Sequence, residues 1–250
     1  MRNWFIAITT GLALTVSMVA SAAEPAPQAP ANPAKAPADA PAEPAPKPLA
    51  PEDEKFVLPK PGPDGYVQIF NGTDLTGWYG DTEVWKVDNG EIVGKTEKGL
   101  KLNNFLKSKF EVGDFRLIVQ VKLTPNTGNS GVQFRSIPWK GYEMKGYQAD
   151  MGKGWWGKIY EESGRGILAK KGGEEFLKPE EWNTYEIVAV GHNILVAING
   201  NLSSELEDDR EGSLVGIFGL QVHSGGPTEV RFKDLKLELK PKLELVTKKK

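Results

Sequence analysis

The sequence of 250 residues contains no cysteine and only two histidines. The absence of cysteine excludes disulfides, thiolate nucleophiles and thiolate-bound zinc or iron–sulfur centres. With two histidines there is no three-histidine zinc site either, so catalysis would have to use carboxylates, arginine, tyrosine or a single histidine. An excess of charge is also lacking, since 31 Lys and Arg oppose 33 Asp and Glu for a net charge of −2. We therefore expect no nucleic-acid partner, because such proteins need a basic surface.

The first 23 residues have the pattern of a secretory signal peptide. Arg2 precedes an apolar run from Trp4 to Ala20, and the run ends in the small residues Ala20–Ala23. Hydroxyl residues and a glycine interrupt the short run, so an uncleaved membrane anchor is the weaker alternative. No cysteine is available for a lipoprotein anchor. We expect an exported protein, periplasmic or extracellular, with no stable membrane insertion after cleavage.

Proline is concentrated in one segment. Residues 24–63 hold thirteen of the eighteen prolines, interleaved with alanine and a few charges. Such a composition cannot bury apolar surface, so it predicts a disordered, semi-extended linker. This leaves residues 64–240 as one folded domain and residues 241–250 as a basic tail.

Helical periodicity is absent from the domain, and alternation with a period of two dominates it. Apolar and polar residues alternate in Asp114–Leu123 and Glu229–Leu239, and Leu214–Ser224 is a third long predicted strand. A turn signal at Gly191-His192-Asn193 predicts a hairpin over residues 185–198. Roughly twelve antiparallel strands in this length predict an all-β fold, a two-sheet β-sandwich of the jelly-roll type. A single closed barrel is the alternative.

Three predicted strands each place a pair of polar side chains on their outer face. The pairs are Gln133 and Arg135, Gln148 and Asp150, and Gln221 and His223. Because alternate residues of a strand share a face, each pair lies opposite the core, and the pairs line one groove if the strands are neighbours. The alternative is an ordinary solvated sheet with incidental polar residues.

Aromatic residues gather in the same part of the chain, namely Trp139, Tyr142, Trp155, Trp156 and Tyr160. A sugar ring has an apolar face that stacks on aromatic rings and hydroxyls that bind amides and carboxylates. The combination predicts a carbohydrate ligand, although each aromatic taken alone is as well explained by packing.

Charged residues beside these aromatics are candidates for chemistry. Glu161 and Glu162 lie close to the aromatic residues in sequence. Glycines around Arg165 allow a tight turn that presents its guanidinium to a ligand; the alternative is that Arg165 forms an ion pair with Asp150 or Glu161. His223 is a better catalytic candidate than His192, which lies in a predicted turn. No cofactor is certain; a divalent metal stays open because hard cations need only oxygen ligands, but no metal-binding spacing is present.

Several motifs occur in order through the domain: Gly65–Trp78, Trp85–Ile92, Gly113–Phe115, Asn129–Arg135, Gly146–Asp150, Gly164–Leu168, Glu181–Asn183 and Leu220–Gly225. Together they resemble the 3-keto-disaccharide hydrolase domain family. The resemblance implies a concanavalin A-like lectin/glucanase sandwich in a secreted bacterial protein that acts on 3-keto-glycosides or 3-keto-disaccharides. The chain departs from the family's tyrosine–glutamate–x–glutamine pattern, so Glu143 and Asp150 are alternatives for its acidic position.

The reaction that the resemblance implies begins with a ketone at the third ring carbon, which acidifies the proton on the second. A general base removes that proton, an acid assists departure of the glycosidic oxygen, and hydration completes a net hydrolysis. Candidate roles are Asp150 or His223 as base, Glu161 as second acid/base, and Arg135, Gln148 and Gln221 as substrate or oxyanion contacts. Trp155, Trp156, Tyr160 and Arg165 are further candidate substrate-binding residues.

Two other functions compete with the enzyme. A non-catalytic, lectin-like carbohydrate-binding module would use the same groove, and lectins and glycosidases share this fold. A structural envelope protein is the third, but it would not need the cluster of polar and aromatic side chains.

Overall fold

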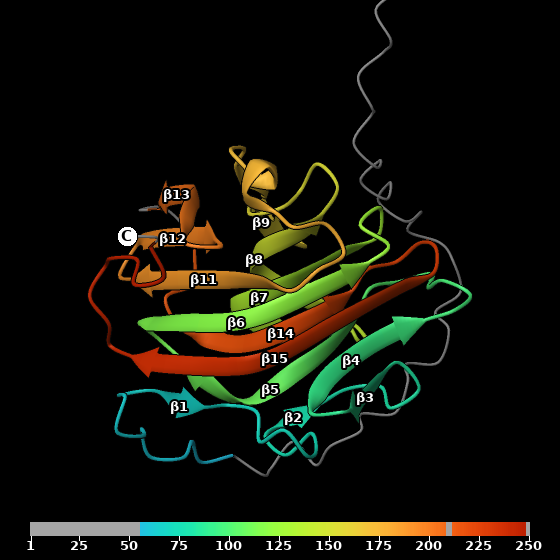
Figure 1. Ribbon diagram of the computed structural model, residues 1–250, viewed down its shortest axis with the longest axis horizontal. Coiled ribbons are helices and arrows are strands. Elements are labelled where there is room, and N and C mark those ends of the chain that lie inside the picture. The colour runs from blue at the N-terminus through green and yellow to red at the C-terminus, as the bar shows by residue number, and fades with distance from the viewer. Residues whose placement is uncertain (1–55, 209–211, 249–250) are drawn as a thin grey trace, which may run out of the picture. The chain divides into compact units, whose positions relative to one another are not determined.

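The computed structural model describes residues 56–208 and 212–248, which form two antiparallel β-sheets packed face to face (Figure 1). The predicted signal peptide and most of the predicted linker lie outside the described residues. In the described part the only helix is a 3-10 turn at Glu174–Phe176. No helix in that part is long and apolar enough to cross a membrane.

Sheet A, the larger sheet, has β6 and β15 at its centre, and these strands pair along nearly their whole length. Its order is β13 (Asn201–Glu207), β12 (Asn193–Ile198), β11 (Asn183–Val190), β6 (Phe115–Thr124), β15 (Thr228–Leu239), β4 (Glu91–Thr96) and β3 (Trp85–Asp88), with β1 (Val67–Gln68) also on β15. The predicted hairpin is confirmed as β11 and β12, which meet at Gly191-His192.

Sheet B carries the strands that the sequence singled out for their polar pairs. Its order is β10 (Gly166–Ala169), β9 (Ile159–Glu162), β8 (Met144–Gly152), β7 (Asn129–Pro138), β14 (Gly216–Val222), β5 (Asn104–Val112) and β2 (Trp78–Tyr79). The predicted two-sheet β-sandwich is therefore confirmed, and the barrel is not formed. Because β7, β8 and β14 are neighbours, their outer faces form one surface.

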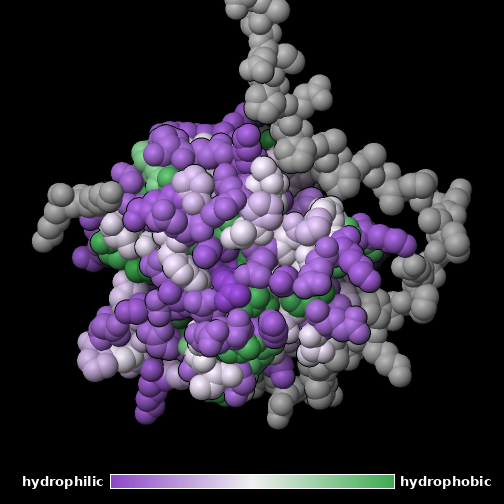
Figure 2. All heavy atoms as spheres, turned by 45° about the vertical axis from the view of Figure 1, so that its right-hand side comes forward, coloured by the Kyte–Doolittle hydropathy of each residue, from purple (hydrophilic) through white to green (hydrophobic). Residues whose placement is uncertain are grey.

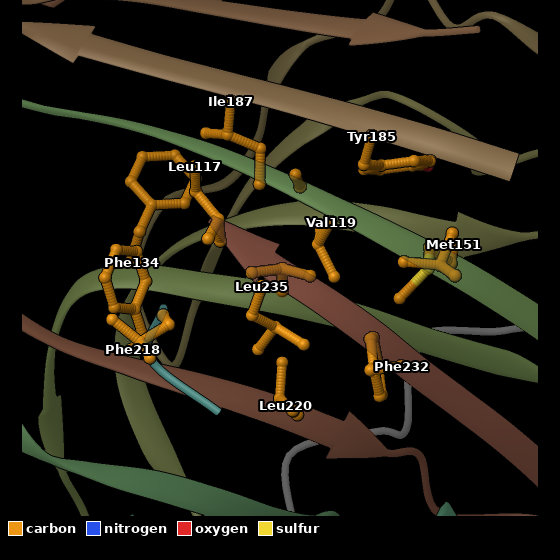
Figure 3. Packing of buried hydrophobic residues seen from close by; sticks show 14 of the residues in the cluster. Leu117, Val119, Phe134, Met151, Tyr185, Ile187, Phe218, Leu220, Phe232 and Leu235 are labelled. Atoms are coloured by element: carbon orange, nitrogen blue, oxygen red, sulfur yellow. The ribbon is translucent and has the colours of Figure 1, made fainter. Parts of the chain in front are cut away.

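The core lies between the sheets and follows from the alternation. Leu117 and Val119 of β6 face Phe134 of β7 and Phe218 of β14 (Figure 3). Phe218 also meets Phe115 edge to face, with ring centroids 4.9 Å apart. Each fully buried aliphatic or aromatic side chain contributes about 1.5–3 kcal/mol, so this interior is what holds the two sheets together.

Two weakly patterned strands escaped the sequence prediction, and a turn delays the start of a third. β13 carries mostly polar residues at the edge of sheet A, and β2 has only two residues. After β8 the chain turns at Trp155–Lys158, and β9 begins only at Ile159. Gly154 and Gly157 adopt positive φ angles of 82° and 74°, and they turn the chain before the strand starts.

Both ends of the domain extend beyond the predicted limits. Phe56, which falls in the predicted linker, packs on Phe110 with ring centroids 6.0 Å apart. At the other end, Leu245 of the predicted tail packs on Val188 and Ala197 of sheet A. The face of the molecule in Figure 2 is mainly hydrophilic, with apolar side chains in small separate patches.

Candidate active site

The polar cluster consists of Gln148, Asp150, Glu162 and Gln221 on the outer face of sheet B. Gln148 Nε2 donates to Asp150 Oδ1 at 2.6 Å and to Gln221 Oε1 at 3.3 Å. Gln221 Nε2 in turn donates to Glu162 Oε2 at 3.4 Å. The predicted shared face of Gln148 and Asp150 is confirmed, because Tyr147, Ala149 and Met151 between and beside them belong to the core. A continuous chain of hydrogen bonds thus crosses β8, β9 and β14.

A glycine in β7 makes room for this chain of bonds. A Cβ atom on Gly131 would lie 2.5 Å from Cδ of Gln148, well inside van der Waals contact. The Gln148 amide therefore lies across the bare backbone of Gly131 toward Gln221. Any side chain at this position would displace the amide from its partners.

Gln133 stands on the same face and lacks partners. It is opposite Gln148 of β8 and Gly219 of β14 in the strand register, and it is fully buried. Neither Nε2 nor Oε1 of Gln133 has a hydrogen-bond partner among the described residues, and neither does Oε1 of Gln148. Leaving a buried polar group unpaired costs about 1–3 kcal/mol. These three atoms are candidate contacts for a ligand.

Two carboxyl groups of the polar cluster have raised pKa values. Burial, reinforced by the charge of Glu162, raises the pKa of Asp150 well above its usual value. Burial, reinforced by the charge of Glu143, raises the pKa of Glu162 to about 7. Near neutral pH this favours a protonated Asp150 beside a Glu162 that is about half ionised, which is the arrangement of an acid and a base.

One buried lysine lies on the neighbouring strand of the same face. Lys107 of β5 is 3% exposed, and burial lowers its pKa to about 8 against the opposing effect of Glu143. Its Nζ lies 3.5 Å from the carbonyl oxygen of Gly141, and Glu143 Oε1 accepts the backbone N–H of Asn103 at 3.1 Å. Both contacts hold the loop between β7 and β8 onto sheet B.

His223 follows β14 two residues after Gln221. Its Nδ1 lies 2.6 Å from the carbonyl oxygen of Ser224, and burial lowers its pKa. The carbonyl can only accept, so Nδ1 carries the proton and Nε2 is the basic nitrogen of a neutral imidazole. His223 can therefore accept a proton at Nε2 and stays a candidate base.

Arg135 does not share the face of Gln133, contrary to the sequence prediction. A bulge in β7 after Phe134 breaks the alternation, and Arg135 adopts a positive φ of 46°. Its guanidinium donates to the carbonyl oxygens of Gly113 at 2.9 Å and Gly191 at 2.6 Å, and to Asp114 Oδ1 at 2.9 Å. At 1% exposure it ties β7 to two turns at one end of the sandwich rather than to the polar cluster.

Glu161 and Arg165 form the ion pair that the sequence analysis kept as the alternative to ligand binding. Arg165 Nε lies 2.6 Å from Glu161 Oε2, and Arg165 also binds both carboxylate oxygens of Asp208, at 3.0 and 2.6 Å. Glu162, not Glu161, turns toward the cluster. Alternation carried through β9 would have shown this, because Ile159 is in the core and Tyr160 and Glu162 are on the outer face.

The predicted aromatic platform is split by the structure. Trp156 is 1% exposed in the core, where its ring lies 6.0 Å from that of Tyr185, so it cannot meet a ligand. Trp155 and Tyr160 pack edge to face, 6.1 Å apart, and both are half-buried. Tyr160 pairs with Gln148 in the strand register. These two rings therefore border the polar cluster.

Side chains that could ligate a metal ion are not clustered within residues 56–208 and 212–248. No group of three or more histidine, aspartate or glutamate side chains there is arranged to hold a metal ion.

Solved structures with the same fold come from carbohydrate-related and uncharacterised proteins. A putative glycosyl hydrolase from Parabacteroides distasonis ATCC 8503 has a TM-score of 0.56 at 20% identity, over 71% of this chain and 95% of that one. The carbohydrate-binding module CBM66 from Bacillus subtilis has a TM-score of 0.53 at 20% identity, over 66% and 98%. A Bacillus subtilis protein of unknown function with a galectin-like fold has a TM-score of 0.53 at 10% identity, over 66% and 90%. At these identities the likeness shows the fold alone.

No curated protein matches the chain. A family model described as the 3-keto-alpha-glucoside-1,2-lyase-like domain matches residues 65–238. The match begins just before β1 and ends within β15, so it includes every strand that contributes to the polar cluster. The chain belongs to the 3-keto-alpha-glucoside-1,2-lyase-like domain family.

Proposed function

We propose that this protein is a sugar-active enzyme that cleaves 3-keto-glycosides or 3-keto-disaccharides by eliminating the glycosidic oxygen. The observation that carries the proposal is the pair of buried carboxyl groups, Asp150 and Glu162, whose raised pKa values suit proton transfer at neutral pH. Membership of the family supports a ketone-bearing sugar as substrate.

The reaction needs one base and one acid. A base takes the proton from C2, and the electron pair of that C–H bond forms a double bond between C1 and C2. The bond from C1 to the glycosidic oxygen breaks, and an acid protonates the departing oxygen. Water then adds at C1, with a proton returned to C2, so that the two steps amount to hydrolysis. Hydrogen bonds to the ketone oxygen stabilise the charge that it gains.

The site offers a residue for each role. Glu162 is the proposed base, because a pKa of about 7 leaves it ionised in part at neutral pH yet basic enough to accept a proton. Asp150, held protonated by burial, is the proposed acid rather than the base. His223 is the alternative base, while Gln148 and Gln221 are proposed substrate contacts.

A non-catalytic lectin-like module is the second candidate function. The half-buried aromatic pair of Trp155 and Tyr160 beside the amides supports it, since such a surface binds sugar without any chemistry. In this case the carboxyl groups would accept hydrogen bonds from hydroxyls. In either function the proposed partner is a carbohydrate, and the signal peptide pattern supports an exported protein.

Adjacent glutamates provide a matched test. We expect the purified chain to release the aglycone from a 3-keto-glucoside, and Glu162→Gln to lower kcat by about a hundredfold or more. Glu161→Gln should keep kcat within a few-fold, because that carboxylate is bound to Arg165. Saturable binding of an unoxidised oligosaccharide without any release would favour the lectin-like module instead.

The pH profile separates the two candidate bases. If Glu162 is the base, kcat/KM rises with pH through an apparent pKa of about 7, and Glu162→Gln abolishes that limb. If His223 is the base, the limb lies below the usual histidine value, because burial lowers the pKa of His223. A limb that survives Glu162→Gln unchanged would contradict the assignment of Glu162.

A further inference from the structure

We infer that Gln133 is a specificity-determining residue whose amide, with that of Gln148, binds two hydroxyls of a neutral sugar ring. The inference rests on the proposed function and deepens it by naming the substrate class. It excludes sugar acids and sugar phosphates as the ring held at this position.

The position of Gln133 at the middle of the site is fixed by strand register. Its neighbours Val132 and Phe134 are core residues, so the side chain between them stands on the outer face of sheet B. Gln148 lies directly opposite on β8, and Gly219 lies opposite on β14. Gly219 has no side chain of its own, and Met144 and Phe105 fill the space above it, so Gln133 lies between this apolar cluster and the polar cluster.

The unpaired atoms at this point form a complementary set. A primary amide offers two N–H donors and one carbonyl acceptor, and both polar atoms of Gln133 are without partners among the described residues. Gln148 Nε2 donates to Asp150 and Gln221, and Gln148 Oε1 is a second acceptor without a partner among the described residues. A hydroxyl both donates and accepts, so two hydroxyls of one ring match this set of one donor group and two acceptors.

The flexible side chain of Met144 fills the space over Gly219. A Cβ atom on Gly219 would lie 2.2 Å from Sδ of Met144, so the thioether rests over the glycine that is opposite Gln133. Met144 begins β8, directly after the loop that Glu143 and Lys107 hold down. Because methionine has three rotatable bonds and no branch, it can leave this position without a change in the sheet.

The charges around the amide select against anions. Three carboxyl groups, Glu143, Glu162 and Asp150, lie on this side of sheet B with one buried cation, and each ionised carboxylate would repel a uronate or phosphate. The cation is Lys107, whose Nζ lies 3.5 Å from the carbonyl oxygen of Gly141 and whose charge acts on Glu143. The guanidinium groups of Arg135 and Arg165 are bound to other residues away from the cluster. A neutral ring meets no such penalty, because hydroxyls bind carboxylates as donors.

Gln133→Met is the test variant, because methionine matches glutamine in length and lacks its polar atoms. Removing an unpaired buried amide should leave the melting temperature unchanged or raise it, whereas a structural role for the amide would require it to fall. Gln120→Met is the control on sheet A, where the half-buried Gln120 donates to Thr184 Oγ1 at 2.8 Å.

Three probes are compared in the full chain: a 3-keto-glucoside, its deoxy analogues at ring positions outside the reacting carbons, and the corresponding 3-keto-glucuronide. We expect Gln133→Met to lower kcat/KM on the glucoside by about tenfold to a hundredfold, and Gln120→Met to leave it unchanged. On the deoxy analogue that lacks the contacted hydroxyl, wild type and Gln133→Met should become equal to within a few-fold. Wild type should prefer the glucoside to the glucuronide by about tenfold or more.

Failure of the inference differs from failure of the proposed function. If wild type turns over the glucoside but Gln133→Met loses the same factor on every analogue, or the glucuronide is preferred, the inference is wrong and the enzyme remains. If wild type shows no turnover, calorimetry with the unoxidised glucoside measures the Gln133 contact directly. Equal affinity of wild type and Gln133→Met, or no binding to either, would overturn it.

Discussion

Replacing Glu162 by glutamine should stabilise the protein above neutral pH. Burial and the charge of Glu143 raise the pKa of Glu162 from 4.5 to about 7, so the folded state binds this proton more tightly than the unfolded state. For such a group stability is greatest below the unfolded pKa and is lost as the pH rises through the folded pKa. One pKa unit is worth about 1.4 kcal/mol, so the full loss has an upper value of about 3 kcal/mol.

Glutamine keeps the shape of Glu162 and an oxygen for the bond from Gln221, but it never ionises. At about pH 8.5 the Glu162→Gln variant should therefore unfold at a temperature about 2–10 °C higher than wild type, from 1–3 kcal/mol in a domain of this size. At about pH 4.5 the two melting temperatures should nearly coincide, because Glu162 carries its proton in the fold. Thermal unfolding followed by circular dichroism across this range measures the difference.

The neighbouring substitution provides the control. Glu161→Gln removes one partner of Arg165 and should lower the melting temperature at the higher pH, the opposite sign to Glu162→Gln. Melting curves for Glu162→Gln that run parallel to those of wild type at every pH, or a variant less stable than wild type above neutral pH, would refute the reasoning. In that case burial does not raise the pKa of Glu162 in the folded state.

Three other changes test the architecture around the site. Truncation after residue 240 should lower the melting temperature by at least about 5 °C, because buried Glu186 loses the backbone N–H donors of Val246 and Thr247, each at 2.9 Å. An unchanged melting temperature would show that the C-terminal segment does not stabilise the fold. Gly131→Ala should cut turnover by about tenfold or more with little effect on folding, since its Cβ displaces the Gln148 amide, and unaltered kinetics would contradict that placement. Trp156→Ala should cost about 3–5 kcal/mol in chemical denaturation; a cost near zero would place this ring outside the core.

Much of the fold could be predicted because alternation in long strands is a direct record of which face is buried. β6 and β15 each carry the pattern over ten residues or more, and their prediction was correct nearly to the residue. β13 could not be predicted in this way, because an edge strand with one exposed face buries too few apolar residues to show a pattern. The packing of Leu245 depends on contacts with β11 and β12, which no local pattern reveals.

The site was predictable to the extent that strands stay regular. Gln148, Asp150 and Gln221 come together as expected, because β8 and β14 hold their alternation and are separated by β7 alone. Arg135 could not be placed, since the bulge in β7 reverses its direction and only the tertiary structure requires that bulge. The acid/base role was assigned to Glu161 rather than Glu162, because the alternation was not followed to the end of β9.

Loss of the C2 hydrogen to solvent tests the proposed elimination most directly. The substrate would be a 3-keto-glucoside carrying deuterium at C2, with the hydrogen content at C2 of the released 3-keto-glucose followed by mass spectrometry and NMR from the first turnovers. Incubation of the free product and reaction with Glu162→Gln correct for spontaneous exchange. Elimination and hydration predict that the released sugar has exchanged its C2 deuterium for solvent hydrogen, with a slower rate on the deuterated substrate. Release with C2 deuterium retained and no isotope effect would show direct substitution at C1 and contradict the account.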